Sequence, residues 1–267
     1  MPEGPECRRF ALSLAERLSG RMLKSIEVIS GRYFDKPPTG LEEFQGQLPI
    51  AVVGVGVHGK FLYWILKDEL SIWNTLGMSG DWSDVQKKHS RVKFVLNDGD
   101  VFFNDMRNFG TLKFVRGKYR LLEKLKSLGP DMLAQDVSDE EFIKRFRRRP
   151  HWQITTALMN QSVIAGVGNY IKAESLWLAR ISPHRILKEI TDAELAALNR
   201  SIRQVMHESF NTEGTTVRTY SDEAGNLNEY NRRYLVYNQK SDPDGNEVVK
   251  ELTADKRMTH WCPAVQY

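Results

Sequence analysis

The sequence predicts an α+β protein of two domains, in which a β-sandwich with a leading helix is followed by a helical domain. Apolar residues recur at helical spacing over residues 5–19, form alternating or short continuous runs over 22–117, and return to helical spacing in the second half of the chain. No regular alternation of helices and strands argues for a parallel doubly wound sheet. We place the domains at residues 1–130 and 131–267, with a linker at Leu128-Gly129-Pro130-Asp131 where the strand pattern ends.

The leading helix has one apolar face and a natural stop at Gly20. The residues of that face recur at helical spacing: Cys7, Phe10, Ala11, Leu14, Ala15 and Leu18. Packing of this face on the core would fix the position of the residues that precede the helix.

The strand region contains alternating and continuous apolar runs, such as those from Val52 to Val57 and from Phe61 to Ile65. Two further runs, 92–96 and 101–103, flank Asn97-Asp98-Gly99-Asp100, which predicts a tight hairpin. Several short strands with turns between them favour a β-sandwich or barrel.

The second domain opens with a capping box, Ser138-Asp139-Glu140-Glu141, at the start of a basic helix that Pro150 stops. Residues 154–160 continue as a helix, and a glycine-bearing turn follows at 162–168. We expect Asn169 to cap the next helix. The N–H groups at that helix N-terminus would form a phosphate site.

The C-terminal part begins after another helix, which opens at Thr191-Asp192-Ala193-Glu194 and runs to about Phe210. It is polar and ends in a predicted hairpin, at about residues 234–266. Its expected strands are Tyr234 to Tyr237 and Glu247 to Val249, on either side of Asp242-Pro243-Asp244-Gly245.

The composition fits a soluble globular protein, with 41% hydrophobic and 27% charged residues, and an intracellular location is the default. No apolar run reaches about 18 residues, and no secretory signal is present, so we expect no contact with membranes. Cys7 and Cys262 lie at opposite ends and suggest no disulfide framework. The net charge of +4 is weak evidence for a nucleic-acid partner, and a solvated helix end explains the basic cluster at 144–149 equally well.

The candidate chemistry lies in the first six residues, Met1-Pro2-Glu3-Gly4-Pro5-Glu6. Removal of Met1 would leave Pro2 with a free secondary amine. An α-amino group has a pKa near ~8, against ~10.4 for lysine, so it is nucleophilic at neutral pH and can attack a sugar carbon to form an iminium. Glu3 supplies an adjoining acid/base group. On this stretch alone, a solvated N-terminal arm is the alternative.

Three further segments contain candidate site residues, and two of them suit the extrusion of a base from a duplex. Lys60 would lower the pKa of a nearby amine by charge repulsion and could hold a phosphate. Met78 lies in a loop between two glycines, and Arg107 and Phe109 lie close together in another loop. Ordinary packing or solvation explains each segment alone. Together, the loop of Met78 and the loop of Arg107 and Phe109 offer the apolar and planar side chains that fill the gap left by an extruded base.

These segments together resemble the formamidopyrimidine-DNA glycosylase / endonuclease VIII family of base-excision repair enzymes. The matching segments occur in the family's order over nearly the whole chain: Pro2-Glu3-Gly4-Pro5-Glu6, His58-Gly59-Lys60, Leu76-Gly77-Met78-Ser79-Gly80, Arg107 with Phe109-Gly110, Ala165-Gly166-Val167-Gly168-Asn169, and Arg257-x-Thr259-x-x-Cys262-Pro263. Each is a modest signal, and the ordered set is a strong one.

The resemblance implies a β-sandwich joined to a helix-two-turn-helix domain, with DNA in the cleft between them. It implies that Pro2 is the Schiff-base nucleophile, with Glu3 as acid/base partner and Lys60 as a further catalytic residue. By the same resemblance the phosphate contacts come from Lys60, Asn169 and Arg257, and the void-filling side chains are Met78, Arg107 and Phe109. The expected activity is removal of an oxidised base followed by β,δ-elimination. The expected partner is double-stranded DNA with oxidised bases or abasic sites, bound by a monomer without a cofactor.

One departure from the family concerns its zinc finger, which most bacterial members build from two Cys-x-x-Cys pairs. Here Asp242-Pro243-Asp244-Gly245 stands where the first pair belongs, and Val265 replaces the last cysteine. Cys262 alone cannot build a four-coordinate zinc site, and oxygen-rich alternatives that use Asp242, Asp244 and His260 are uncommon. We therefore expect a zincless finger held by packing. This resembles the endonuclease VIII-like 1 branch, and favours oxidised pyrimidines and hydantoins as substrates.

Two alternatives remain open at this point. The chain could be an 8-oxoguanine enzyme of the same family, because the segment 217–233 is long enough to form a lesion-capping loop. It could also be a non-catalytic module that binds damaged DNA, although such a module would not need Pro2 and Glu3.

Overall fold

The structure is a computed structural model that describes residues 2–212 and 234–267. The chain divides into two compact units, of which the first contains Pro2 and residues 6–127 and the second residues 3–5 and 128–267. The expected lesion-capping loop at 217–233 lies outside the described residues. None of the helices in the described part of the chain has the length and hydropathy that a bilayer-spanning helix requires.

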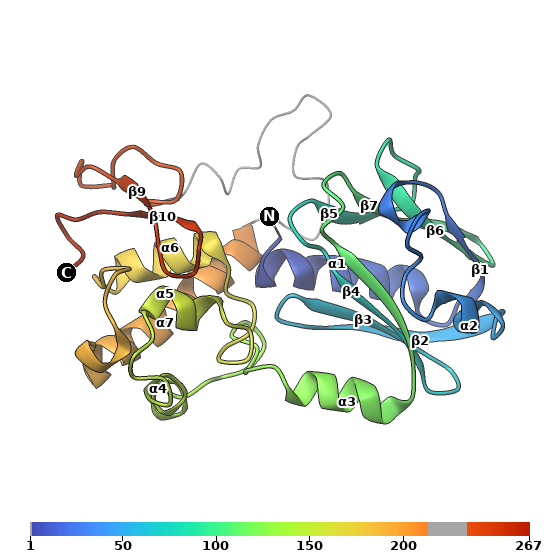
Figure 1. Ribbon diagram of the computed structural model, residues 1–267, viewed down its shortest axis with the longest axis horizontal. Coiled ribbons are helices and arrows are strands. Elements are labelled where there is room, and N and C mark those ends of the chain that lie inside the picture. The colour runs from blue at the N-terminus through green and yellow to red at the C-terminus, as the bar shows by residue number, and fades with distance from the viewer. Residues whose placement is uncertain (1, 213–233) are drawn as a thin grey trace. The chain divides into compact units, whose positions relative to one another are not determined.

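The first unit is built on an antiparallel sheet with the strand order β5-β7-β6-β1-β2-β3-β4-β8. The strands are β1 (Met22–Val28), β2 (Ile50–His58), β3 (Phe61–Leu66), β4 (Leu70–Thr75), β5 (Gly80–Ser83), β6 (Ser90–Leu96), β7 (Gly99–Asp105) and β8 (Thr111–Arg116). β1 and β2 pair at two positions, Met22 with Ala51 and Leu23 with Ile50. The sheet folds at this junction into two halves, which form the separate layers of a β-sandwich (Figure 1).

Aromatic side chains from both halves fill the space between the layers. Trp64 of β3 lies with its ring centroid 5.2 Å from Trp82 of β5 and 5.0 Å from Phe94 of β6. Phe103 of β7 extends the cluster, 5.3 Å from Trp82. All four side chains are buried. The predicted hairpin at 97–100 is confirmed, because Leu96 pairs directly with Gly99.

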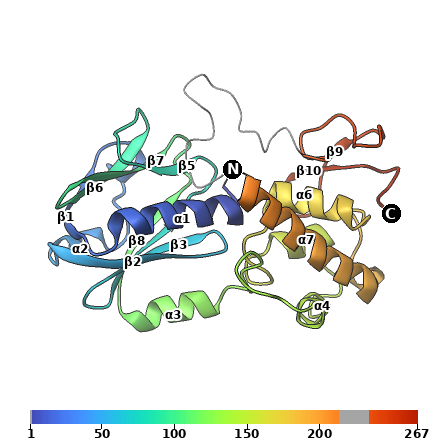
Figure 2. The same ribbon diagram turned by 180° about the vertical axis from the view of Figure 1, so that it is seen from behind.

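The leading helix α1 (Gly4–Leu18) runs alongside the two layers (Figure 2). The predicted apolar face is buried at Cys7, Phe10, Ala11, Leu14 and Leu18, which confirms that packing on the core fixes this helix. The first unit also contains the short helices η1 (Gly31–Tyr33), α2 (Leu41–Gln45) and α3 (Lys118–Lys126), which the apolar pattern did not predict.

The second unit contains a helical core. Its helices are α4 (Asp139–Arg147), α5 (Ile154–Met159), α6 (Asn169–Leu178), η2 (Leu187–Glu189) and α7 (Asp192–Thr212). The Ser138 hydroxyl accepts a hydrogen bond from the Glu141 N–H at 3.1 Å, as the predicted capping box requires. Phe142 and Phe146 stack in the core with their centroids 4.3 Å apart.

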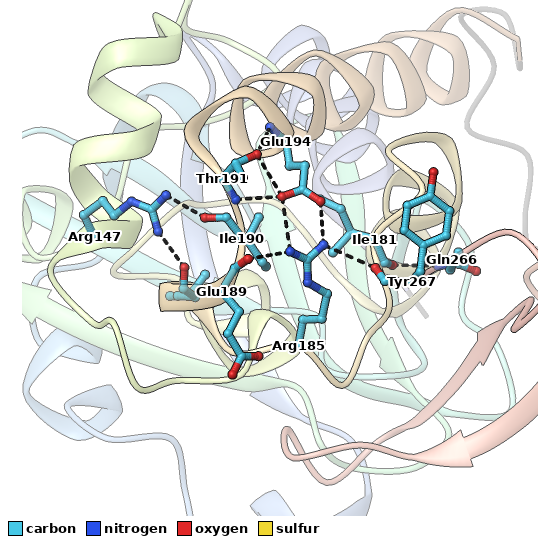
Figure 3. A network of polar contacts seen from close by, with 10 residues as sticks. Arg147, Ile181, Arg185, Glu189, Ile190, Thr191, Glu194, Gln266 and Tyr267 are labelled. Carbon is cyan, nitrogen blue, oxygen red and sulfur yellow. Dashed lines mark hydrogen bonds and ion pairs between the residues drawn. The ribbon is translucent and has the colours of Figure 1, made fainter.

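A second capping box begins α7 and joins it to the preceding loop. The Glu194 carboxylate accepts from the Thr191 N–H at 2.6 Å, and the Thr191 hydroxyl accepts from the Glu194 N–H at 3.2 Å. Arg185 donates to the same carboxylate at 2.5 Å and to the carbonyl oxygens of Glu189 and Tyr267 (Figure 3). Arg147 binds the carbonyl oxygen of Ile190 nearby.

The C-terminal hairpin has different strands from those predicted. It consists of β9 (Val249–Leu252) and β10 (Met258–Trp261), whereas Tyr234 to Tyr237 form no strand. The reason is the buried carboxylate of Glu174 on α6, which accepts the N–H groups of Leu235, Val236 and Tyr237 at 2.7–2.9 Å. Because their donors are bound to Glu174, these residues cannot donate to a strand ladder.

Candidate active site

The carboxylate of Glu3 lies on the N-terminus of α6. Its Oε1 accepts from the Tyr170 N–H at 2.9 Å and its Oε2 from the Ile171 N–H at 3.3 Å. Glu3 is 1% exposed, so the helix end supplies hydrogen bonds that water would otherwise provide. The positive end of the helix dipole favours the negative charge.

Two glycines allow the N-terminal segment to approach α6. A Cβ atom on Gly168 would lie 2.1 Å from Glu3 Cδ, and a Cβ on Gly4 would lie 3.1 Å from Gly166 Cα. The Gly4 N–H donates to the Gly166 carbonyl at 2.9 Å. Gly166 has a φ of 100°, which favours glycine. Glu3 is thus fastened beside Pro2, the candidate nucleophile, and Pro2 is itself buried.

The prediction that Asn169 caps α6 is wrong, because Gly168 is the capping residue and makes no side-chain cap bond. Glu3, which is distant in sequence, accepts hydrogen bonds from two of the N–H groups that a capping side chain would have bound. Those two N–H groups are therefore not available to a phosphate. The Asn169 side chain instead donates from Nδ2 to the Met258 carbonyl oxygen at 3.0 Å. Asn169 therefore joins α6 to the C-terminal hairpin.

Arg257 lies at the end of the turn between β9 and β10. The Arg257 carbonyl oxygen accepts from the Thr253 N–H at 3.1 Å, and the turn packs on α6 through an ion pair between Lys172 and Asp255. The pair is buried, and its N–O distance is 2.6 Å. Burial lowers the pKa of Lys172, whereas Asp255 and Glu3 act in the opposite direction. The sequence pattern indicates Arg257 but not the ion pair.

Tyr237 is a further side chain near these groups. Burial raises the pKa of its phenol, and so does the charge of Glu3, whereas a hydrogen bond from Asn169 and the charge of Arg257 lower it. The hydroxyl therefore stays protonated at neutral pH. In the second unit the structure thus brings Glu3, Asn169 and Arg257 into one electrostatic neighbourhood, with Tyr237 as a member that the sequence pattern did not indicate.

The predicted void-filling residues lie together in the first unit. Gly77 (φ 61°) lies in the loop that contains Met78. It packs so closely on the loop of Arg107 and Phe109 that a Cβ atom on it would lie 2.7 Å from the Gly110 nitrogen. The Arg107 guanidinium lies 4.9 Å from the centre of the Phe109 ring. Met78 is 37% and Phe109 54% exposed, so both are accessible apolar side chains.

The buried carboxylate of Asp105 holds these two loops in register. It accepts from the Ser79 hydroxyl at 2.6 Å, from the Arg107 N–H at 3.2 Å and from the Gly110 N–H at 2.6 Å. Ser79 follows Met78 directly and also accepts from the Arg107 N–H at 2.9 Å. We call Met78, Arg107 and Phe109 the wedge. Lys60 lies apart from the wedge in sequence, in the turn between β2 and β3.

The sequence signal for the residues that were missed is weak. Asp105 occurs in the segment that contains Arg107 and Phe109, so a search for a buried carboxylate near that loop could have found it. Lys172 and Asp255 are 83 residues apart, and no local pattern relates them.

Comparisons with known proteins identify the family. Residues 1–112 match the formamidopyrimidine-DNA glycosylase N-terminal domain, 128–221 its H2TH domain and 225–267 its C-terminal domain. A formamidopyrimidine-DNA glycosylase of Pelotomaculum thermopropionicum is 32% identical over 100% of this chain and 99% of its own length. The chain belongs to the formamidopyrimidine-DNA glycosylase family. The relative from Halalkalibacterium halodurans is 29% identical over the full length of both chains.

Solved structures of the family share this fold. The Lactococcus lactis formamidopyrimidine-DNA glycosylase, bound to DNA that contains an AP site, matches with a TM-score of 0.82 at 25% identity over 99% of both chains. MutM in complex with carbocyclic 8-oxo-G containing DNA matches with a TM-score of 0.84 at 26% identity over 100% of both. The predicted α+β fold, with a β-sandwich, a leading helix and a helix-two-turn-helix domain, is confirmed.

The residues at the finger do not fit a structural zinc ion. In the described parts of the chain, no group of three or more His, Cys, Asp or Glu residues is placed to hold a metal. Burial raises the pKa of the Cys262 thiol, which favours the protonated form. Asp242 accepts from the Asn246 N–H at 2.8 Å, the Asp244 N–H at 3.0 Å and the Trp177 indole N–H at 3.3 Å. These bonds occupy the oxygens that a metal would need.

Proposed function

We propose that this protein is a bifunctional DNA glycosylase and abasic-site lyase that uses the amine of Pro2 as its nucleophile. The observation that carries the proposal is the Glu3 carboxylate, which is buried on the N-terminus of α6 directly beside Pro2 in the chain. A non-catalytic binding module would have no use for a fastened carboxylate next to a nucleophile. Membership of the formamidopyrimidine-DNA glycosylase family supports the same reading.

The proposed reaction begins after Met1 has been removed. The Pro2 nitrogen forms a bond to C1′ of the damaged nucleotide, and the bond from C1′ to the base breaks. The base takes up a proton and leaves as a neutral molecule, and the Pro2 nitrogen loses the proton that it carried. The nitrogen lone pair then forms the iminium at C1′ while the C1′–O4′ bond breaks and Glu3 protonates O4′. Loss of a C2′ proton expels the 3′ phosphate, a second elimination expels the 5′ phosphate, and water releases the amine.

The wedge and the phosphate-contacting residues prepare the substrate. Met78, Arg107 and Phe109 would enter the space left by the extruded base, for which accessible apolar and planar side chains are suited. Lys60, Asn169 and Arg257 would contact the phosphates beside the lesion, and Lys60 would also keep the pKa of the Pro2 amine low. The finger that contains Arg257 would function without zinc.

For the substrate we propose formamidopyrimidine and 8-oxoguanine lesions in double-stranded DNA. The support comes from the relatives, whose names specify formamidopyrimidine, and from the related complex with 8-oxo-G containing DNA. A second candidate is the set of oxidised pyrimidines and hydantoins, which sequence analysis favoured. That candidate, and assignment to the endonuclease VIII-like 1 branch, rest on the missing zinc thiols.

Borohydride trapping tests this proposal, because it reduces the iminium and leaves the protein covalently bound to DNA. We expect trapping on duplexes with formamidopyrimidine or 8-oxoguanine, and less on thymine glycol. The reverse order would favour the second candidate.

An N-terminal tag that blocks the Pro2 amine should abolish trapping. A tagged protein that traps normally would refute Pro2 as nucleophile. Glu3→Gln should lower base excision about 10²–10⁴-fold while DNA binding persists.

A further inference from the structure

The ion pair between Lys172 and Asp255 is almost completely buried. Its side chains are 0% and 3% exposed. Removing two charges from water costs several kcal/mol per ion, and well-packed apolar residues of similar volume often stabilise a fold as well or better. Buried charges can instead fix one defined arrangement of two elements. The elements joined here are α6 and the turn between β9 and β10.

Asp255 is also bound within its own turn, close to Arg257. The Thr253 hydroxyl oxygen lies 2.5 Å from Asp255 Oδ1, 3.1 Å from the Arg257 carbonyl oxygen and 2.7 Å from the Thr259 hydroxyl. Thr253 and Thr259 are both buried. The Thr253 hydroxyl therefore joins the two ends of this turn and the Arg257 carbonyl to Asp255, the carboxylate that pairs with Lys172.

A second attachment lies on the other side of Arg257. Asn169 Nδ2 donates to the Met258 carbonyl oxygen at 3.0 Å. Asn169 and Lys172 lie one turn apart on the same face of α6. Arg257 is thus placed between two residues, Asp255 and Met258, that are each bound to this face.

We propose that Lys172 and Asp255 are positioning residues that aim Arg257 at a DNA phosphate, where zinc-bearing relatives would use metal-held thiolates to fix the finger. The proposal rests on the proposed phosphate contact of Arg257 and adds the residues that orient it. Orientation matters because a guanidinium binds phosphate oxygens in a planar, bidentate geometry. Lys172 has a second effect, since it neutralises a carboxylate two residues from Arg257 that would otherwise attract this cation away from a phosphate.

The test uses the double variant Lys172→Met/Asp255→Asn, which leaves the net charge of the protein unchanged. Its dissociation constant for a duplex with a tetrahydrofuran abasic-site analogue is measured over a range of salt concentrations. One lost phosphate contact lowers the slope of log K against log salt by about one unit. We expect this loss in the double variant and in Arg257→Ala, with no further loss when all three substitutions are combined.

The matched control is Arg203→Met/Asp136→Asn, which removes a partly exposed ion pair of the same unit and also preserves net charge. It should keep the wild-type slope. Lys172→Met alone should bind more weakly than the double variant, because it leaves Asp255 without its partner. Thermal unfolding is recorded for every variant. A merely structural ion pair would lower the unfolding temperature and leave the slope intact, and this result overturns the proposal.

Two outcomes separate this proposal from the proposed function. A wild-type slope in the double variant, with a reduced slope in Arg257→Ala, refutes the positioning role alone. A wild-type slope in Arg257→Ala refutes the phosphate contact itself and the positioning role with it.

If the double variant does not fold, Thr253→Val replaces it, since this isosteric change removes the hydroxyl that joins Asp255 to Arg257. It should weaken binding a few-fold, and unchanged binding overturns the proposal.

Discussion

At the scale of single residues, the position of Glu3 depends on the absence of a side chain at Gly168. The Glu3 carboxyl carbon occupies the place where a Cβ atom on residue 168 would lie, at 2.1 Å. The contact can be relieved only if the carboxylate moves away from the two backbone N–H groups of α6 whose hydrogen bonds it accepts. Gly168 is therefore required for the geometry of the candidate acid/base group.

We predict that Gly168→Ala displaces Glu3 and lowers base excision by much of the roughly 10²–10⁴-fold that acid/base catalysis contributes. Single-turnover excision on a duplex with one damaged base measures the loss. Gly54→Ala is the control, because a Cβ atom at Gly54 meets nothing within 4 Å. Wild-type excision by the Gly168→Ala protein would show that the observed Glu3 geometry is not needed.

Residue chemistry also limits what the sequence could reveal about this site. The free amine of Pro2 and the adjoining Glu3 follow from residue types and order alone, so the candidate nucleophile and acid/base group were predictable. The acceptors that fix Glu3 were not, because α6 is far from it in sequence. Asn169 illustrates the same limit: its residue type predicted a cap, and a tertiary contact gave its side chain another partner.

At the scale of elements, the Asp105 carboxylate joins the two loops of the wedge by hydrogen bonds. We predict that alanine at Met78, Arg107 or Phe109 slows excision of a base from duplex DNA, where unstacking costs a few kcal/mol. Cleavage at a preformed abasic site should change less, because no base has to be extruded. The two rates are compared for each variant, with Phe34→Ala as an exposed aromatic control in the same unit. Equal losses on both substrates would contradict a void-filling role.

The N-terminus of α7 gives a pH-dependent prediction. A hydrogen bond from Arg185 is the main reason that the pKa of Glu194 falls from 4.5 to about 2 (Figure 3). The folded protein therefore favours the ionised form, and this stabilisation is present above pH 4.5 and lost as the pH falls towards 2. Since the pair is partly exposed, we expect only about 1 kcal/mol.

Unfolding by urea, measured from pH 7 down to pH 2, tests this expectation against Glu194→Gln. The stability difference between the two proteins should shrink as the pH falls below 4.5. A difference that stays constant over this range would mean that the charge of Glu194 is not what stabilises the helix start.

At the scale of the whole molecule, local signals predicted the fold better than they predicted the contacts between distant segments. The capping box at Ser138, the helix start at Thr191 and the hairpin at 97–100 depend on neighbouring residues, so the sequence alone indicated them. The strand expected at Tyr234 to Tyr237 was wrong because its donors bind Glu174, 61–63 residues away. No local pattern contains that information.

In the finger, contacts between distant segments bear on a functional expectation, namely that the finger needs no metal. Asp242 is 4% exposed. Burial alone would raise its pKa, but the bonds from Asn246, Trp177 and Asp244 outweigh it and lower the pKa, so the group is a buried carboxylate anion. Cys262 lies in the same small core, with Trp177 and Val236. An anion with several donors around it can hold a turn as a metal with its ligands does.

We therefore predict that a chelator such as EDTA changes neither the unfolding temperature nor base excision. Asp242→Ala should lower stability by about 1–3 kcal/mol, because it leaves the buried indole N–H of Trp177 and two backbone N–H groups of the turn without their acceptor. Thermal unfolding with and without chelator, together with elemental analysis of the purified protein, measures both effects. Asp244→Ala is the control, since Asp244 contributes only its backbone N–H to the Asp242 carboxylate. Stoichiometric zinc, or a protein that unfolds when chelator is added, would show that a metal and not the Asp242 carboxylate holds the finger.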